Sequence, residues 1–205
     1  MRIVKDIEQG SIEWNQLRLG KVTASRIKDV MTNGRGSAIS KTSESYMYEL
    51  LADLLTGEPQ PFFENDAMRW GTETEPKARL MYELKTGIEV EQVAFIEHSD
   101  FIGVSPDGLI GNTGLIEIKC PKTTTQLKRS QQENYHTDYK YQIQMQLWVS
   151  ERDWCDFLSF DPRLQGKAKY LCERVYRDEK IIADMQDKTE VFVDKLKSLF
   201  ESLKD

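Results

Sequence analysis

The spacing of apolar residues predicts that the first part of the chain is helical. In four segments apolar positions recur every three to four residues, the pattern of a helix with one buried face. The predicted helices cover about residues 11–19, 23–31, 43–55 and 66–85. Gly57 and Gly87 follow the last two, where glycine commonly ends a helix because it tolerates a left-handed backbone.

After residue 87 the pattern changes to short runs of β-branched and aromatic residues, which predict strands. We expect strands over about 88–97, 101–105, 114–119, 154–160 and 169–176, and helices over about 138–150 and 179–203. This order predicts an α/β (α+β) fold in which helices flank a central mixed β-sheet. No linker divides the 205 residues, so we expect a single domain, with a helical part over about 1–87 and a sheet with its following helices over about 88–205.

The composition is that of a folded protein without membrane spans. Hydrophobic residues make up 39% of the chain, and the longest apolar runs are about four residues, far below the ~18 of a membrane helix. The first ten residues lack the apolar segment of a secretory signal. The three cysteines are scattered without CxxC spacing, which argues against a disulfide framework, a zinc knuckle or an iron–sulfur cluster and favours a reducing cytoplasm.

The charge distribution gives a divided signal. The formal net charge is −6, whereas nucleic-acid-binding domains usually carry a basic excess. Basic residues nevertheless gather in two stretches: residues 15–42 hold six of them against one acid, and residues 118–132 hold four and no acid. These stretches could focus a polyanion into one cleft, and ordinary solvated surfaces explain them equally well. Composition alone does not decide.

The candidate chemistry lies between residues 104 and 121, VSPDGLIGNTGLIEIKCP. Asp107 follows Pro106, and Glu117 and Lys119 alternate with apolar residues in a predicted strand. Because side chains alternate along a strand, Glu117 and Lys119 should lie on one face. We interpret the segment between Asp107 and Glu117 as a turn that returns the chain, which brings the two carboxylates together.

Two adjacent carboxylates repel each other, and a hard divalent cation such as Mg²⁺ relieves the repulsion. The backbone carbonyl of Ile118 offers one more oxygen ligand. Lys119 stands on the same face, where it can orient a metal-bound water or help to deprotonate it. Metal-assisted hydrolysis of a phosphodiester is the chemistry that these groups suit. The alternative is an ordinary exposed salt bridge between Glu117 and Lys119.

These motifs resemble a known family. SPDG and GLIEIKCP resemble the active-site core of the lambda exonuclease and YqaJ viral recombinase family, within the PD-(D/E)xK nuclease superfamily. Three further blocks resemble other signatures of the family in the family's order: EWNQLRLGKVTAS over 13–25, RWGTETE over 69–75 and YKYQIQMQLW over 139–148. The resemblance implies a core like that of the restriction endonucleases.

The resemblance also implies a function. Phage alkaline exonucleases of this kind degrade one strand of duplex DNA from its 5′ end, release mononucleotides and leave a 3′ single-stranded tail. The implied cofactor is Mg²⁺, as two ions, and Mn²⁺ also suits oxygen ligands. A ring-shaped homotrimer is implied, with a single-strand annealing protein as partner in phage-type recombination. The implied location is the cytoplasm of a bacterial host.

Single residues gain roles from the same resemblance. Asp107, Glu117 and Lys119 match the catalytic trio. Glu75 matches a helix glutamate that completes the metal site directly or through water, beside the carbonyl of Ile118. The adjacent Pro76 should kink that helix or mark its first turn. In some related nucleases a tyrosine follows, four residues later, the glutamine that matches Gln142. This chain has Gln146 at that place, so no role that depends on the tyrosine is carried over.

The implied pocket for a terminal 5′-phosphate comprises Arg18, Ser25, Ser105 and Gln142. A guanidinium gives charge-assisted contacts to phosphate oxygens, and Ser25 falls in the first turn of a predicted helix, whose N-terminus favours an anion. Met68 matches an apolar wedge between the strands at the duplex end. Arg35 lies in a loop flanked by glycines, where we expect it to contact the DNA backbone. The alternatives are a surface arginine, a capping serine, a helix glutamine, a core methionine and a solvated loop charge.

The sequence leaves two other functions open. A site-specific or structure-specific endonuclease would need a base-reading element, and no insertion obviously provides one. A non-catalytic DNA-end-binding module would not need all four of Glu75, Asp107, Glu117 and Lys119, which are present.

Overall fold

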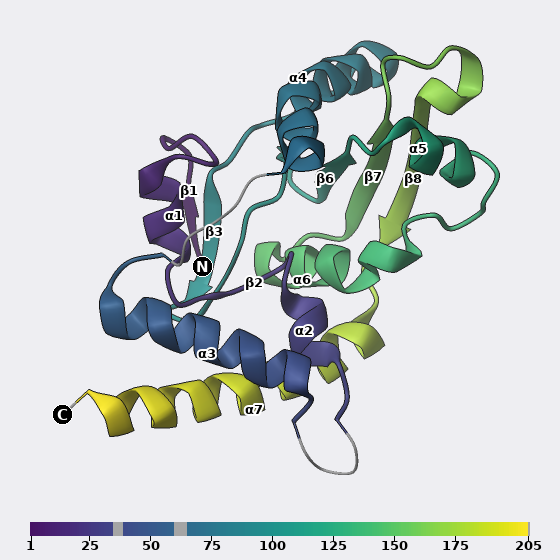
Figure 1. Cartoon of the computed structure of the whole chain (residues 1–205). Helices are drawn as coiled ribbons and strands as arrows, with labels where there is room; N and C mark the ends of the chain where they lie inside the picture. Colours follow the sequence, from purple (N-terminus) through teal and green to yellow (C-terminus); the bar gives the residue numbers. More distant parts are fainter. Residues whose placement is uncertain (35–38, 60–64, 205) are drawn as a thin grey trace.

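The computed structural model describes residues 1–34, 39–59 and 65–204 (Figure 1). Its first part is mostly helical, and its second part alternates strands with helices. The elements in chain order are β1 (Arg2–Val4), α1 (Ile12–Arg18), β2 (Val22–Thr23), α2 (Ile27–Met31), α3 (Lys41–Thr56), α4 (Asp66–Thr86), β3 (Phe95–Ser99), β4 (Ile102–Val104), β5 (Gly108–Ile110), β6 (Gly114–Lys119), α5 (Thr123–Arg129), η1 (Thr137–Tyr139), α6 (Lys140–Ser150), β7 (Trp154–Phe160), η2 (Gly166–Lys169), β8 (Tyr170–Tyr176) and α7 (Glu179–Leu203).

The strands form two four-stranded mixed sheets. One has the order β1-β3-β4-β2 with β2 and β4 parallel, and the other has the order β5-β6-β7-β8 with β6 and β7 parallel. An antiparallel bridge between Glu91 and Leu109 joins the segment before β3 to β5. The predicted α/β class is confirmed, although the strands are divided between two sheets instead of gathered in one. Pro106, which has no backbone N–H, lies between β4 and β5 and interrupts the strand there.

Two helices cover opposite faces of the β5–β8 sheet. On one face α4 contributes Ala78 and Tyr82 to a core that includes Ile116 of β6. On the other face α6 packs against β7, and Leu115 of β6 and Phe157 of β7 belong to a larger core. Successive residues of β6 therefore face different helices, as the alternation of a strand requires.

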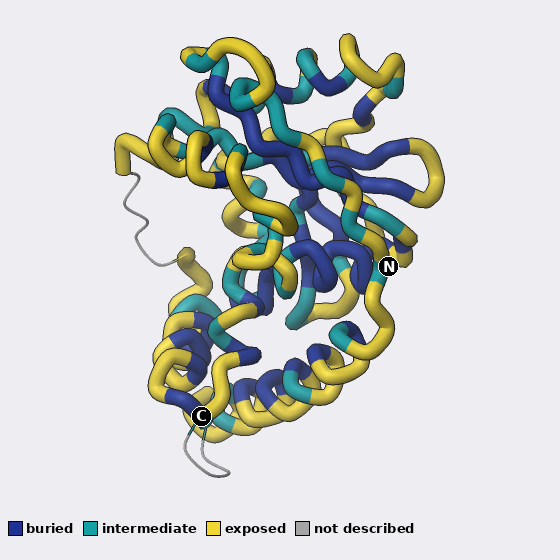
Figure 2. Tube along the Cα trace, turned by 90° about the vertical axis from the view of Figure 1, so that its right-hand side faces the viewer, coloured by how far each residue is buried: buried dark blue, intermediate teal, exposed yellow. Residues whose placement is uncertain are grey.

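A layer of helices lies below the sheets in Figure 1. In this layer α3 and α7 run side by side, and α7 also contacts α2 and α6. The larger core includes residues of both sheets and of these helices. In Figure 2 the buried residues, in dark blue, are concentrated in strands near the centre of the molecule and recur at intervals along the long helices below them. No helix among the described residues is long and apolar enough to span a membrane.

Most of the predicted elements are present. The bounds of β6, β7 and α7 agree with the expected ranges. Gly57 and Gly87 end α3 and α4 with positive φ angles of 69° and 70°. These elements are long or strongly patterned, so local residue spacing is enough to define them.

Other local expectations are wrong. Residues 23–26 are not helical, because Val22–Thr23 pair with β4 and α2 begins only at Ile27, so Ser25 does not stand in a helical turn. Within the expected strand 88–97, regular strand structure begins only at Phe95, the first residue of β3. Part of the expected turn between Asp107 and Glu117 is strand β5. Pro76 lies in the middle of α4 and not in its first turn, so of the two expectations for this proline only a kink in the helix stays a prediction.

Candidate active site

The hairpin of β5 and β6 brings Asp107 beside the strand that carries Glu117. Gly108 opposes Ile116 in the antiparallel register, so Asp107 lies at the level of Glu117. The backbone N–H of Ile118 donates to Oδ2 of Asp107 at 2.5 Å. Buried Arg152 holds the turn, since its Nη1 donates to the carbonyl oxygens of residues 110, 111 and 114. The expectation that the chain returns here and places Asp107 next to this strand is confirmed.

Glu117 and Lys119 share the face of β6 that is turned toward α6. Glu117 is 1% exposed and forms an ion pair with Lys119. Nε2 of Gln142 donates to Oε1 of Glu117 at 2.6 Å, and Nε2 of Gln146 donates to Oε2 at 2.7 Å. The ring centroid of Tyr139 lies 5.1 Å from Nζ of Lys119. Each oxygen of this buried carboxylate thus accepts from at least one donor, as a buried charge requires.

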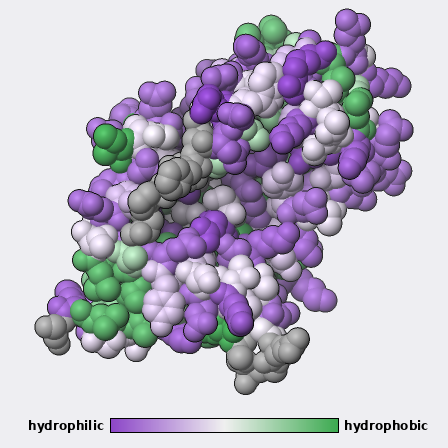
Figure 3. All heavy atoms as spheres, viewed as in Figure 1, coloured by the Kyte–Doolittle hydropathy of each residue, from purple (hydrophilic) through white to green (hydrophobic). Residues whose placement is uncertain are grey.

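Glu75 approaches the same site from α4. It forms an ion pair with Arg79, one helical turn further on. Glu75 and Asp107 line a cavity of about 800 Å³, together with Met68 of α4 and Trp14 of α1. Residues 7–11 also line this cavity. In Figure 3 most of the side chains on the face viewed are hydrophilic, and hydrophobic ones gather at the lower left over the ends of α3 and α7.

Two of the carboxylates, Asp107 and Glu75, have a raised pKa. Burial, with the charges of Glu117 and Glu75, raises the pKa of Asp107 well above its usual value. Burial also raises the pKa of Glu75, a shift that Arg79 opposes and Glu117 strengthens. Burial lowers the pKa of Lys119, but Glu117 and Asp107 outweigh burial and raise it above its usual value. The site therefore combines one ammonium group, that of Lys119, with the three carboxyl groups of Glu75, Asp107 and Glu117.

The donor set suits a hard divalent cation, although the side chains as they stand do not form a coordination shell. Carboxylates and the carbonyl of Ile118 are the oxygen ligands that Mg²⁺ prefers, and a cation would offset the repulsion among the acids. Within residues 1–34, 39–59 and 65–204, no group of three or more His, Cys, Asp or Glu side chains is arranged to hold a metal ion. Asp107 faces an amide, and Glu117 faces Lys119 and two glutamines.

A second group of polar residues surrounds Thr23. The guanidinium of Arg18 makes long hydrogen bonds to Oγ of Ser105 at 3.4 Å and Oγ1 of Thr23 at 3.5 Å, and Oγ of Ser25 lies 3.5 Å from the same Oγ1. Arg18 stacks 4.1 Å above the indole of Trp14, whose Nε1 donates to Ser105 at 3.0 Å. Three residues of the implied phosphate pocket thus lie together.

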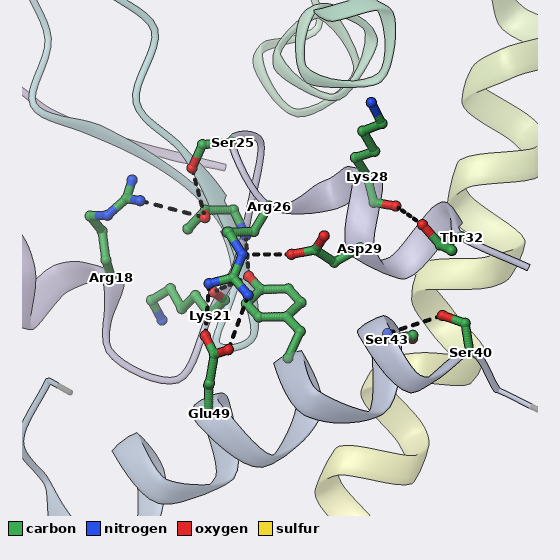
Figure 4. Close-up of polar contacts among 12 residues, drawn as sticks. Arg18, Lys21, Ser25, Arg26, Lys28, Asp29, Thr32, Ser40, Ser43 and Glu49 are labelled. Atoms are coloured by element: carbon green, nitrogen blue, oxygen red, sulfur yellow. Dashed lines mark hydrogen bonds and ion pairs between the residues drawn. The ribbon is translucent and has the colours of Figure 1, made fainter. Parts of the chain in front are cut away.

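Arg18 differs from its neighbour Arg26 in what surrounds its charge. Arg26 forms ion pairs with Asp29 at 2.6 Å and Glu49 at 2.7 Å, and these acids raise its pKa although burial lowers it. In the described part of the chain no carboxylate pairs with Arg18, and burial lowers the pKa of Arg18 to about 10. Figure 4 shows Arg18 and Ser25 hydrogen-bonded to the same side chain, and Arg26 directed to Asp29 and Glu49. Arg18 remains charged at neutral pH and is available to an anion.

The fourth residue of the implied phosphate pocket, Gln142, lies elsewhere. Gln142 contacts Glu117, and none of its hydrogen bonds to described residues reaches Arg18. Met68 is exposed in the first turn of α4 at the cavity. Ser25 is exposed. Arg35 lies outside the described residues.

Sequence reasoning assigns no role to Arg79, Gln146 or Trp14. Arg79 and Gln146 contact the candidate carboxylates. The available signal was helical spacing, because residues four apart share a face of a helix. Glu75 and Arg79 have this spacing, and so do Gln142 and Gln146. Trp14 gives no such signal, since its contact with Ser105 joins distant segments.

Comparison with known proteins adds independent evidence. The sequence model of the YqaJ-like viral recombinase domain family matches residues 13–153. The chain belongs to this family. The resemblance inferred from the four sequence blocks is thereby confirmed.

Solved structures similar to this YqaJ-like protein include exonucleases. An alkaline exonuclease from Laribacter hongkongensis (LHK-Exo) is 41% identical with a TM-score of 0.84, over 95% of this chain and 96% of that one. The same protein in complex with dAMP is 42% identical with a TM-score of 0.83, over 95% and 96%. A phage related exonuclease from Haemophilus somnus 129PT has a TM-score of 0.71 at 17% identity, over 92% and 99%, and shows the same fold.

An uncharacterized protein of Acanthamoeba polyphaga mimivirus is also related in sequence. It is 29% identical over 171 residues, which make up 76% of this chain and 29% of that protein. The chain thus spans less than a third of the length of this relative.

Proposed function

We propose that this YqaJ-like protein is a Mg²⁺-dependent exonuclease that acts on the ends of double-stranded DNA in the 5′→3′ direction. It would release mononucleotides and leave a 3′ single-stranded tail. The observation that carries the proposal is the convergence of Asp107, Glu117, Lys119 and Glu75, since their charges act on one another and Glu75 and Asp107 line one cavity. Further support comes from the similarity over nearly the whole chain to LHK-Exo, which is described as an alkaline exonuclease.

The carboxylates are proposed to hold the cation. Asp107, Glu117 and the carbonyl of Ile118 would supply ligands, and Glu75 would act directly or through water. We propose two Mg²⁺ ions, for which Mn²⁺ can substitute because it has the same preference for oxygen. The bound metal would supply Lewis acidity toward the scissile phosphate.

Lys119 is proposed to orient and stabilise the reacting groups. Its ammonium is held between Glu117 and the ring of Tyr139. The carboxylates raise the pKa of Lys119, so the charged form prevails at neutral pH. A charged amine cannot accept a proton, and it can hold a phosphate oxygen or a water molecule in place. We therefore favour orientation over proton abstraction as its role.

Arg18, with Ser105 and Ser25, is proposed to receive the terminal 5′-phosphate. A guanidinium that has no carboxylate partner within the described chain, and that is stacked on an indole, is both charged and held in place. Gln142 and Arg35 are proposed as further DNA contacts. Met68, exposed at the cavity, is proposed as the wedge between the strands of the duplex end.

The assembly is proposed from the family resemblance. The whole chain would act as one exonuclease domain in a ring-shaped homotrimer. Its partner would be a single-strand annealing protein, and its location the cytoplasm of a bacterial host. An acidic exterior around a basic channel would reconcile the net charge of −6 with binding to DNA.

Digestion of linear and covalently closed circular duplex tests the proposal. With Mg²⁺ we expect linear DNA to be consumed and closed circles to survive, and we expect EDTA or Asp107→Ala to stop the loss. Nicking or linearisation of the circle at catalytic protein concentrations would favour an endonuclease. Equal loss of DNA with Mg²⁺ and EDTA would reject the metal mechanism, and binding without any loss would favour a non-catalytic module.

A further inference from the structure

Two buried glutamines of α6, Gln144 and Gln146, use their amides differently. Their exposed fractions are 3% and 0%. Gln144 serves the backbone with both ends of its amide: Nε2 donates to the carbonyl of Tyr176 at 2.9 Å, and Oε1 accepts from the N–H of Asp178 at 2.8 Å. Gln146 donates from Nε2 to Oε2 of Glu117 at 2.7 Å, while its own Oε1 has no hydrogen-bond partner among the described residues.

The orientation of the Gln146 amide is set by Glu117. A buried acceptor without a partner is unfavourable. Turning the amide by half a revolution would place Oε1 against a carboxylate oxygen, which is worse for an ionised Glu117. The amide therefore keeps its N–H toward Glu117 although its own oxygen stays unpaired. The Gln146 amide therefore stabilises the Glu117 carboxylate and leaves its own oxygen unpaired.

The contacts to Glu117 also decide which of its oxygens can accept a further ligand. A carboxylate oxygen has about two acceptor sites. Oε1 receives Nε2 of Gln142 and Nζ of Lys119, so both of its sites are filled. Oε2 receives Gln146 and retains one site. A cation that displaces none of these bonds must bind Glu117 at Oε2, the oxygen that Gln146 holds.

We propose that Gln146 is a positioning residue that directs Oε2 of Glu117 toward a divalent cation. The inference rests on the proposed metal-dependent nuclease function and adds the residue that selects the ligand oxygen. Gln142 and Gln146 stand one helical turn apart, so they hold the two oxygens of one carboxylate from the same face of α6. Gln144, between them in sequence, bonds to the start of α7 and the end of β8 instead.

The variant Gln146→Met tests the proposal, with Gln144→Met as the matched control. Methionine keeps the length of the side chain and removes the amide. We expect Gln146→Met to weaken Mn²⁺ binding, measured by calorimetric titration, by about tenfold or more, as for other residues that orient a metal ligand. The Mg²⁺ concentration for half-maximal cleavage should rise in parallel. Gln144→Met should lower thermal stability and leave Mn²⁺ affinity unchanged.

Two results would overturn the proposal. One is a folded Gln146→Met variant whose Mn²⁺ affinity stays within about twofold of wild type. The other is an equal loss in both glutamine variants, which would indicate general loosening of α6. If Gln146→Met does not fold, Gln146→Asn replaces it, because asparagine keeps the amide but is one methylene too short to reach Glu117. A wild-type protein with neither Mn²⁺ binding nor Mg²⁺-dependent cleavage would reject the proposed function itself and this inference with it.

Discussion

Arg18 and Arg26 lie in the same basic stretch, and their surroundings give them different expected roles. Acids surround Arg26, whereas hydroxyl groups and an indole surround Arg18. We expect Arg18→Ala to weaken the preference for 5′-phosphorylated over 5′-hydroxyl ends by about 1.5–3 kcal/mol, the contribution of a hydrogen bond to a charged group. Cleavage rates on both kinds of end measure this preference.

Arg26→Ala is the control for this prediction. Its charge is already neutralised by Asp29 and Glu49, so its removal should leave the preference for 5′-phosphate as it is in wild type. An unchanged preference in Arg18→Ala, or an equal loss in both variants, would contradict the assignment of the pocket.

The raised pKa of Asp107 predicts how the stability of the folded protein depends on pH. Its pKa is raised in the folded state, so the folded protein holds the proton more tightly than the unfolded chain does. The ionised carboxylate therefore costs stability. The cost is absent below the ordinary Asp pKa of about 4, grows as the pH rises toward the folded pKa and is complete above it. At neutral pH without divalent cations, Asp107→Asn should stabilise the protein.

Thermal unfolding measures this effect. A gain of 1 kcal/mol in stability moves the Tm of a chain of this size by roughly 2–4 °C. We expect a higher Tm for Asp107→Asn than for wild type, and a stabilising effect of Mg²⁺ on wild type that the variant lacks.

The variant Asp161→Asn should change the Tm in the opposite direction. Burial raises the pKa of Asp161, but its hydrogen bonds to Arg163 and Thr123 outweigh burial and lower it. This carboxylate adds stability above the ordinary Asp pKa, and that stability is lost as the pH falls through the folded pKa. Asp161→Asn should thus lower the Tm at neutral pH. A fall in Tm for Asp107→Asn as well would contradict the electrostatic account of the site.

At the scale of elements, the β5–β6 hairpin determines where Asp107 stands. A Cβ added at Gly108 would overlap Cγ1 of Val90 and lie 3.3 Å from Cγ2 of Ile116. We expect Gly108→Ala to lower the free energy of unfolding by about 1–3 kcal/mol, the usual cost of overpacking. Urea unfolding measures the change.

Gly71 in α4 is the matched control, because a Cβ there meets nothing within 4 Å. Alanine is a better helix former than glycine, so Gly71→Ala should stabilise by roughly 0.5–1 kcal/mol. A Gly108→Ala variant as stable as wild type would show that the hairpin can shift, and the position of Asp107 would then not depend on this contact.

The elements also show what sequence pattern can and cannot define. The bounds of β6, β7 and α7 follow from alternation or helical spacing over six or more residues. The strands β2 and β5 have two and three residues, too few for any period to be recognised. The helix α5 begins with three threonines, which are weak helix formers, and the sequence pattern does not indicate it.

At the scale of the whole molecule, the candidate site is assembled from α4, the β5–β6 hairpin and α6. The family resemblance names most of its residues, and strand alternation places Glu117 and Lys119 on one face. Neither the resemblance nor the alternation reveals that Gln142 bonds to Glu117 and not to Arg18. Such contacts depend on how two helices are rotated against opposite faces of one sheet, which no local pattern encodes.

The charge distribution also makes a prediction for the whole molecule. If basic residues gather in one cleft, duplex DNA should bind a non-cleaving Asp107→Ala protein with strong salt dependence although the net charge is −6. We expect the logarithm of the binding constant to fall with the logarithm of salt concentration with a slope of about −3 or steeper, because each neutralised phosphate contributes about −0.9. Fluorescence anisotropy measures the slope, and a value near zero would contradict a basic cleft.

The most direct measurement is the digestion of linear duplex DNA labelled at its 5′ ends or at its 3′ ends, in the presence of Mg²⁺. We predict that the 5′ label appears at once as a mononucleotide, while the 3′ label stays in a long single strand, and that ends without a 5′-phosphate react more slowly. Early release of the 3′ label, or release of both labels in internal fragments, would contradict the central claim of a 5′→3′ exonuclease.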